Sequence, residues 1–194
     1  MSDYTGIQKN RIWQIAHSSI ALIFSHQKFV LPTEWKEDTA FFEKRGTFVT
    51  LTKNNSLRGC IGSILPTKPL WIDIAENAVH AAFHDPRFKP LEEYELADLS
   101  IEVSVLTVPI QVNYSSFQNL EQNIRPLLDG VIIEYGYAKA TFLPQVWEEL
   151  PNPRDFFKHL CLKAGLPGNF FQTRFTDLTI YTYQADIIKQ EKSN

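Results

Sequence analysis

Apolar residues recur every three or four positions in several stretches of the chain. This spacing places them on one face of a helix, so each stretch is predicted to form an amphipathic helix. The predicted helices cover roughly residues 8–26, 69–84, 117–124 and 153–164. The last has the clearest boundaries, because Asn152 can cap its first turn, Pro153 suits its first position and Gly165 follows its end.

Other stretches alternate apolar and polar residues, or carry short apolar runs, as β-strands do. Asn54 and Asn55 tolerate positive φ, and they predict a hairpin turn between two of these strands. Pro86 and Pro90 predict a loop. The predicted strands cover roughly 48–52, 57–64, 99–107, 131–135, 140–143 and 175–187.

Helices and strands are mixed here without a regular βαβ rhythm, which predicts an α+β fold with mostly antiparallel sheets and packed helices. A chain of 194 residues can bury a substantial core, as one domain or as two small interlocked lobes. We expect one domain over residues 1–188, with two sub-lobes, followed by a polar tail over 189–194. Phenylalanines grouped in pairs are expected in the core or along a seam between the lobes, namely Phe41, Phe42, Phe156, Phe157, Phe170 and Phe171.

Composition narrows the class of protein further. The chain is 44% hydrophobic and 21% charged, and 19 basic against 22 acidic residues give a net charge of −3. Because no block of Lys and Arg stands out, nucleic-acid binding is disfavoured. No apolar run is long enough to cross a bilayer, and the first residues lack the layout of a signal peptide. With two cysteines, too few for a disulfide framework, we expect a cytoplasmic protein whose thiols are free.

The candidate chemistry is concentrated in the segment Leu57-Arg58-Gly59-Cys60-Ile61-Gly62. Glycines on both sides of a cysteine indicate a backbone that bends or is closely approached. Arg58 is able to favour the thiolate of Cys60, which makes Cys60 the candidate nucleophile or redox thiol. The alternatives are a bulged strand with a buried cysteine, and an anion-binding nest of N–H groups around Gly59 and Gly62.

A second motif, Asp85-Pro86-Arg87-Phe88, follows the predicted second helix. Arg87 either clamps a carboxylate or phosphate of a substrate or pairs structurally with Asp85, which can also bind the backbone of its own turn. His80 and His84 have the spacing of two metal ligands, but no third ligand accompanies them, so we expect a solvated pair and no metal site. Cys161 lies on an apolar helical stripe and is expected in the core.

Several segments occur in one order between Gly46 and Leu166: GTFVTL, LRGCIG, DPRF, IEVSVL, FLPQVW and KAGL. Together they resemble the AMMECR-type domain, which in prokaryotes is called AmmeMemoRadiSam system protein A. The resemblance covers nearly the whole chain. It implies a two-lobed α+β fold with a cleft near LRGCIG, and the motif residues Arg58, Gly59, Cys60, Gly62, Asp85 and Arg87.

The resemblance implies no particular reaction and no cofactor. Genome neighbourhoods of such domains suggest Memo-like and radical-SAM proteins as partners in a modification or redox pathway. The first hypothesis is an enzyme or enzyme component that binds a small or peptide-borne anionic ligand through Arg58, Gly59, Gly62, Asp85 and Arg87, with Cys60 as the reactive group. The alternative is a non-catalytic adaptor that docks a partner protein through the same surface.

Overall fold

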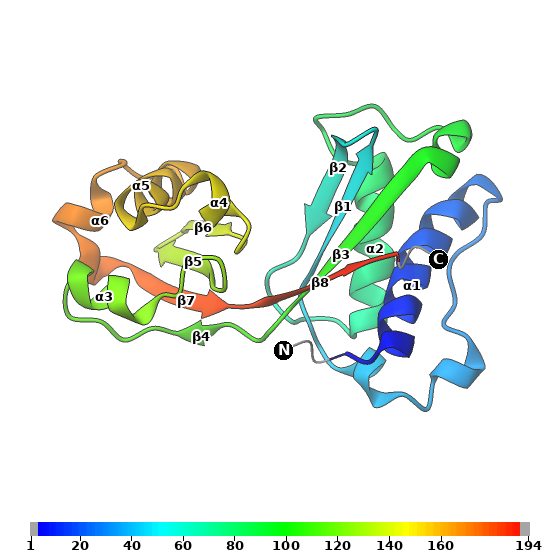
Figure 1. Ribbon diagram of the computed structural model, residues 1–194, viewed down its shortest axis with the longest axis horizontal. Helices are drawn as coiled ribbons and strands as arrows, with labels where there is room; N and C mark the ends of the chain where they lie inside the picture. Colours follow the sequence, from blue (N-terminus) through cyan, green and yellow to red (C-terminus); the bar gives the residue numbers. More distant parts are fainter. Residues whose placement is uncertain (1–3, 191–194) are drawn as a thin grey trace. The chain divides into compact units, whose positions relative to one another are not determined.

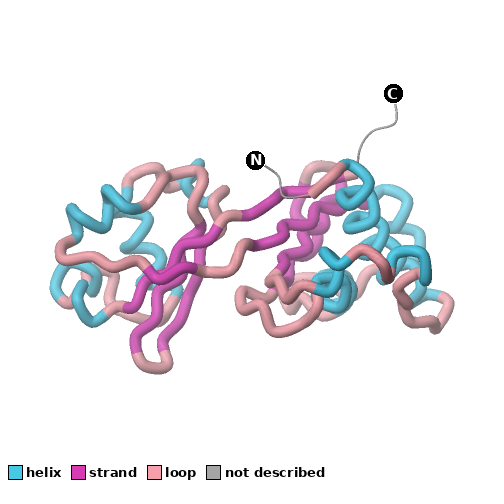
Figure 2. The backbone as a smooth tube through the Cα atoms, turned by 90° about the horizontal axis from the view of Figure 1, so that it is seen from below, coloured by secondary structure: helices cyan, strands magenta, loops and turns pink. Residues whose placement is uncertain are grey.

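The computed structural model describes residues 4–190 and shows two compact units. The first unit contains the residues up to Leu106 together with those from Asp186 onward, and the second contains Thr107–Ala185. Both units combine an antiparallel sheet with helices, so the α+β prediction is confirmed. Figure 2 shows that each unit keeps its helices on one side of its own sheet. Among the described residues, no helix is long and apolar enough to cross a membrane.

The first unit has a four-stranded sheet in the order β2-β1-β3-β8, with α1 and α2 packed on one face (Figure 1). Buried aliphatic side chains such as Val49, Leu51 and Val103 point from the sheet into the core beneath these helices. Its elements in chain order are α1 (Gly6–Phe24), the 3-10 turns Thr33–Trp35 and Thr39–Phe42, β1 (Thr47–Lys53), β2 (Ser56–Gly62), α2 (Leu70–Phe83), the 3-10 turn Glu93–Asp98, β3 (Leu99–Leu106) and β8 (Ala185–Lys189).

The second unit has a four-stranded sheet in the order β4-β7-β5-β6 and a core rich in aromatic rings. Trp147 stacks on Phe156 with 3.6 Å between ring centroids. Its elements are β4 (Ile110–Gln111), α3 (Phe117–Asn123), β5 (Gly130–Tyr135), β6 (Ala138–Phe142), α4 (Val146–Glu149), α5 (Pro153–Lys163), α6 (Phe170–Thr173), the 3-10 turn Phe175–Asp177 and β7 (Thr179–Tyr183).

Most predicted elements are present within a few residues of their expected bounds. The hairpin turn is confirmed, because Asn54 and Asn55 have φ values of 51° and 61° between β1 and β2. The predicted strand over 175–187 is wrong as a single element: β7 pairs with β5, whereas β8 joins β3 in the other sheet, with Gln184 between the two strands. The chain passes from one unit to the other at this point, and no local sequence pattern indicates this boundary.

The paired phenylalanines follow the prediction with one exception. Phe42 is 44% exposed, because a 3-10 turn places it on the opposite side from its buried neighbour Phe41. The polar tail predicted over 189–194 begins at Lys189, which ends β8 and pairs with Glu102 at 3.0 Å. Residues 191–194 lie outside the described residues. The cleft between the lobes stays a prediction.

Candidate functional site

Strand β2, which carries the cysteine motif, contains a β-bulge. The pairing with β1 shifts between Leu51, which opposes Gly59, and Thr52, which opposes Leu57, so Arg58 is the extra residue. A bulge of this kind locally increases twist and re-aims the side chain that it carries. The bulge that the sequence predicts as one reading of this motif is therefore present, and it turns Arg58 out of the regular strand pattern.

The two glycines of the motif lie where the backbone is closely approached. A Cβ at Gly59 would be 2.1 Å from the carbonyl oxygen of Ala81 in α2, so the strand and the helix pack backbone to backbone. A Cβ at Gly62 would lie 2.4 Å from the ring of Phe48 and 2.5 Å from the carbonyl oxygen of Thr47. Packing thus accounts for both glycines, and their role in binding a ligand stays a prediction.

Cys60 is partly exposed and opposes Thr50 of β1, on the sheet face turned away from the core. The hydroxyl of Thr50 lies 3.4 Å from Sγ and donates a hydrogen bond to it. Cys161, in contrast, is fully buried in α5, as predicted, and burial raises the pKa of its thiol. Both cysteines are free, also as predicted. The chain thus holds one accessible thiol and one inaccessible thiol.

The DPRF motif holds the backbone of Cys60 at the free edge of the sheet. Strand β2 is an edge strand, so one row of its peptide groups has no strand partner. Asp85 Oδ2 accepts a hydrogen bond of 2.9 Å from the Cys60 N–H, and Arg87 Nη2 donates one of 3.3 Å to the Cys60 carbonyl. The two motifs therefore meet at one residue and cap the sheet edge there.

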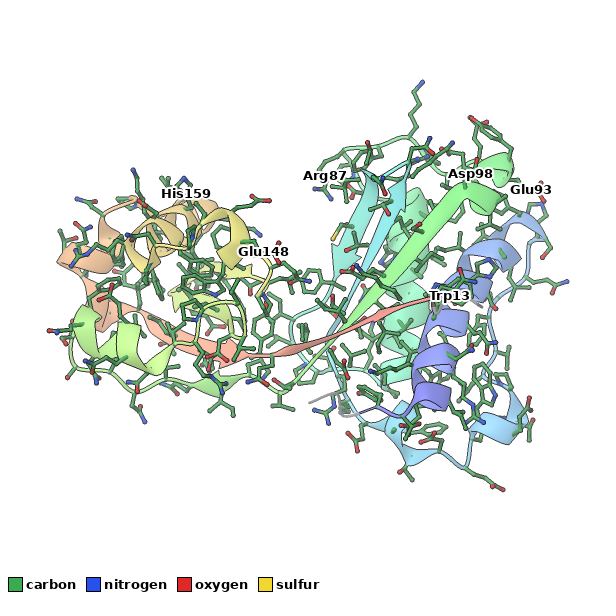
Figure 3. All side chains as sticks on the ribbon, viewed as in Figure 1. Trp13, Arg87, Glu93, Asp98, Glu148 and His159 are labelled. Atoms are coloured by element: carbon green, nitrogen blue, oxygen red, sulfur yellow. The ribbon has the colours of Figure 1, made fainter. Side chains whose placement is uncertain are left out.

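Asp85 and Arg87 also bind each other. Oδ1 of Asp85 accepts bonds from the Arg87 backbone N–H at 3.1 Å and from Nε at 2.9 Å, and Oδ2 accepts one from Nη2 at 2.7 Å. The Arg87 guanidinium, aided by the Cys60 N–H, holds the pKa of Asp85 well below its usual range. The Asp85 side chain is 2% exposed and that of Arg87 is 54% exposed, at the surface beside β2 (Figure 3).

Arg58 makes a different set of contacts. Its Nε and Nη2 bind the carboxylate of Glu95 at 3.1 and 2.8 Å, while Nη1 and Nη2 donate to the carbonyls of Lys89 and Pro90 at 3.0 and 3.3 Å. Lys53 also binds Glu95, at 3.1 Å. The hydrogen bond from Arg58 lowers the pKa of Glu95 to about 2. Arg58 thus fastens the segment after DPRF to the bulge, and its predicted action on the thiol stays a prediction.

A buried polar network that the sequence motifs do not indicate lies next to the LRGCIG segment. Asp73, in the first turn of α2, accepts hydrogen bonds from the hydroxyls of Thr47 at 2.7 Å and Ser63 at 2.6 Å, and from the amide of Asn77 at 2.9 Å. Burial raises the pKa of Asp73. The spacing of Asp73 and Asn77, one helical turn apart, is the sequence feature from which the network could have been predicted. The network joins the ends of β1 and β2 to α2.

The chain is similar to a known protein family and to archaeal proteins. A family model, AMMECR1, matches residues 13–188, which confirms the resemblance seen in the sequence motifs. A protein of Methanothermobacter thermautotrophicus is 42% identical over 152 residues, covering 78% of each chain. The protein NEQ441 of Nanoarchaeum equitans is 34% identical over 180 residues, covering 92% of this chain and 98% of its own.

One solved structure shares the fold over most of the chain. It is the crystal structure of the uncharacterized protein PH0010 from Pyrococcus horikoshii, which superposes with a TM-score of 0.82 and 31% sequence identity. The match covers 92% of this chain and 89% of that chain. The arrangement of helices and strands described above is therefore shared with an experimentally determined relative.

Proposed function

This chain belongs to the AMMECR1 family, and we propose that it is an enzyme or enzyme component whose reactive group is the Cys60 thiol and whose anion-binding group is Arg87. One observation carries the proposal: the side chains of Asp85 and Arg87 hold the N–H and the carbonyl of Cys60. This arrangement fixes the backbone that carries the thiol, and the Arg87 guanidinium donates to the carbonyl of that same residue. The substrate would be small or peptide-borne and would carry a carboxylate or phosphate.

The surroundings of Cys60 suit a reactive thiol. Cys60 lies on the partly exposed face of β2, and the Thr50 hydroxyl donates a hydrogen bond to Sγ. A negatively charged sulfur accepts such a bond more strongly than a neutral one. The thiolate is the form of a cysteine that acts as a nucleophile.

Of the two arginines in the motifs, Arg87 is the better placed to bind a ligand. Its side chain is 54% exposed, whereas that of Arg58 is 14% exposed and uses Nε, Nη1 and Nη2 to hold Glu95 and two backbone carbonyls. None of the bonds that Arg87 makes to Asp85 or Cys60 comes from its Nη1. We assign Arg58 a positioning role, as the residue that fastens the loop behind the site.

The test is the alkylation rate of Cys60 in the native protein, with mass spectrometry separating it from Cys161. We expect Cys60 to react much faster than buried Cys161, and an anionic ligand to slow that reaction. Inorganic phosphate, succinate and an acidic peptide are the probes. Protection should be lost in Arg87→Gln and kept in Arg125→Gln, a matched exposed arginine that also binds a buried aspartate. Equal rates for the two thiols, or protection that survives Arg87→Gln, would contradict the proposal.

An adaptor role is the second candidate, and one observation favours it: carboxylates of the chain itself already neutralise Arg58 and Arg87. In that role the surface would dock a Memo-like or radical-SAM protein. Co-purification with such a partner should then survive Cys60→Ser and fail with Arg87→Gln. Arg58→Glu is less suitable, because it would place a second carboxylate against Glu95.

A further inference from the structure

Two histidines lie at the carboxyl end of helix α2. His80 and His84 are four residues apart, His80 in the last turn of the helix and His84 directly after its last residue. Their ring centroids are 5.4 Å apart with an interplanar angle of 89°. Both residues are exposed. The two imidazole rings are therefore close together in space at the surface, and not only close in the sequence.

The backbone under both rings is fixed. The N–H of His84 donates to the carbonyl of His80 at 2.8 Å, which closes the last turn of the helix. The next residue, Asp85, is held by the Cys60 N–H at 2.9 Å and by Arg87. A ligand pair that is anchored on both sides loses little conformational freedom when it binds an ion. The carboxyl end of a helix also carries partial negative charge, which favours a cation nearby.

The donor set defines which ion would fit. Imidazole nitrogen suits Zn²⁺, Ni²⁺ and Cu²⁺, whereas Mg²⁺ and Ca²⁺ prefer oxygen. Glu76, one turn before His80, is already paired with Lys68. Within residues 4–190, no group of three or more His, Cys, Asp or Glu is arranged to hold a metal. The site therefore offers two protein donors, and water or an exogenous ligand would complete the coordination.

We propose that His80 and His84 together bind a divalent transition-metal ion at the end of α2. The sequence predicts a solvated pair and no metal; the proposal departs from that prediction on the ground that the two ring centroids lie 5.4 Å apart. The proposal is independent of any role for Cys60. Two imidazoles that share one ion bind it more tightly than either alone, since the second ligand acts at high effective concentration.

The test is calorimetric titration of the full chain with Ni²⁺ at neutral pH, using protein without a polyhistidine tag. We expect one site per chain, weakened about tenfold or more in His80→Asn and in His84→Asn. His159→Asn is the matched control, because His159 is an exposed histidine on α5 in the other unit (Figure 3). It should leave the affinity unchanged. Acidification should weaken binding, since a protonated imidazole has no lone pair for the metal.

One further variant and one stability measurement complete the test. Cys60→Ser should bind Ni²⁺ as the wild type does, which separates the imidazole site from metal capture by the thiol. Thermal unfolding of each variant without metal checks that the fold is intact. Equal Ni²⁺ affinity in the wild type and His80→Asn, or loss of binding in Cys60→Ser, would overturn the proposal.

Discussion

The two units each contain an exposed arginine bound to a buried aspartate, and the two pairs are built alike. Arg87 in the first unit and Arg125 in the second both use the backbone N–H, Nε and Nη2 to bind both oxygens of the carboxylate. The arginine side chains are 54% and 61% exposed, and the aspartate side chains, Asp85 and Asp129, are 2% and 4% exposed. In chemistry and burial the pairs are nearly interchangeable.

They differ in what they hold. Asp85 and Arg87 reach across to the backbone of Cys60 on an edge strand distant in the sequence. The Arg125–Asp129 pair closes its own loop, and the Asp129 carbonyl then accepts the indole N–H of Trp147 at 2.8 Å. An ion pair of the same kind thus holds the backbone of a strand in the first unit and closes a loop in the second. Only the pair that reaches a cysteine is a candidate functional site.

The largest expected difference between the two units is the loss of stability when a glycine near each pair, Gly59 or Gly130, is replaced by alanine. In Gly59→Ala the new Cβ would meet the helix backbone at Ala81 O, which cannot move without shifting α2; in Gly130→Ala it would meet the ring of Tyr183 at 2.5 Å. We expect Gly59→Ala to lower the free energy of unfolding by more than about 3 kcal/mol, and Gly130→Ala by about 1–3 kcal/mol. Denaturant unfolding, with hydrogen exchange to assign the loss to a unit, measures both. A milder effect for Gly59→Ala than for Gly130→Ala would contradict the backbone contact.

Removing the charge of each aspartate is the next test of the comparison. Asp85→Asn should lower the free energy of unfolding by about 2–3 kcal/mol, and Asp129→Asn by about 1–2 kcal/mol, because only Asp85 also binds a strand N–H. Alkylation separates the roles more sharply than stability does. We expect the reactivity of Cys60 to change in Asp85→Asn and to stay at the wild-type value in Asp129→Asn.

The pH dependence of this difference follows from the lowered pKa of Asp85. A carboxyl group whose pKa is lower in the folded chain than in the unfolded chain stabilises the fold fully above the ordinary pKa of about 4. That contribution is lost as the pH falls below this value toward the folded pKa. The stability gap between wild type and Asp85→Asn should therefore shrink in acid. A gap that is constant between pH 7 and pH 3 would show that the charge of Asp85 contributes nothing.

The smallest expected effect concerns the loop that the Arg125–Asp129 pair closes. Leu127 has a φ of 69°, a left-handed conformation that is costly for leucine, and the residue is 59% exposed. Leu127→Gly should relieve this strain and raise the free energy of unfolding slightly, by about 0.5 kcal/mol after the entropy cost of glycine is included. Thermal unfolding is the measurement. Destabilisation by 1 kcal/mol or more would mean that the exposed leucine makes contacts that stabilise the fold.

Local patterns in the sequence determined most of the secondary structure. The helical stripes, the alternation in β3 and the Asn54-Asn55 turn each depend on residues close together in the chain, and each is present in the structure. The division of the predicted 175–187 strand between two sheets was not predictable in this way. It depends on pairing with β5 and β3, which are distant in the sequence, so no local periodicity encodes it.

For the candidate site, too, the sequence determined one part and the tertiary structure another. The sequence by itself identified LRGCIG and DPRF as the candidate motifs and Cys60 as the candidate thiol. Only the tertiary structure decided that Gly59 is required by the approach of α2, that Arg58 is committed to Glu95, and that Asp85 and Arg87 meet at the Cys60 peptide. The physical reason is that hydrogen bonds and close contacts join atoms that folding brings together. Residue type fixes which bonds a side chain is able to make, and the fold fixes which partner it reaches.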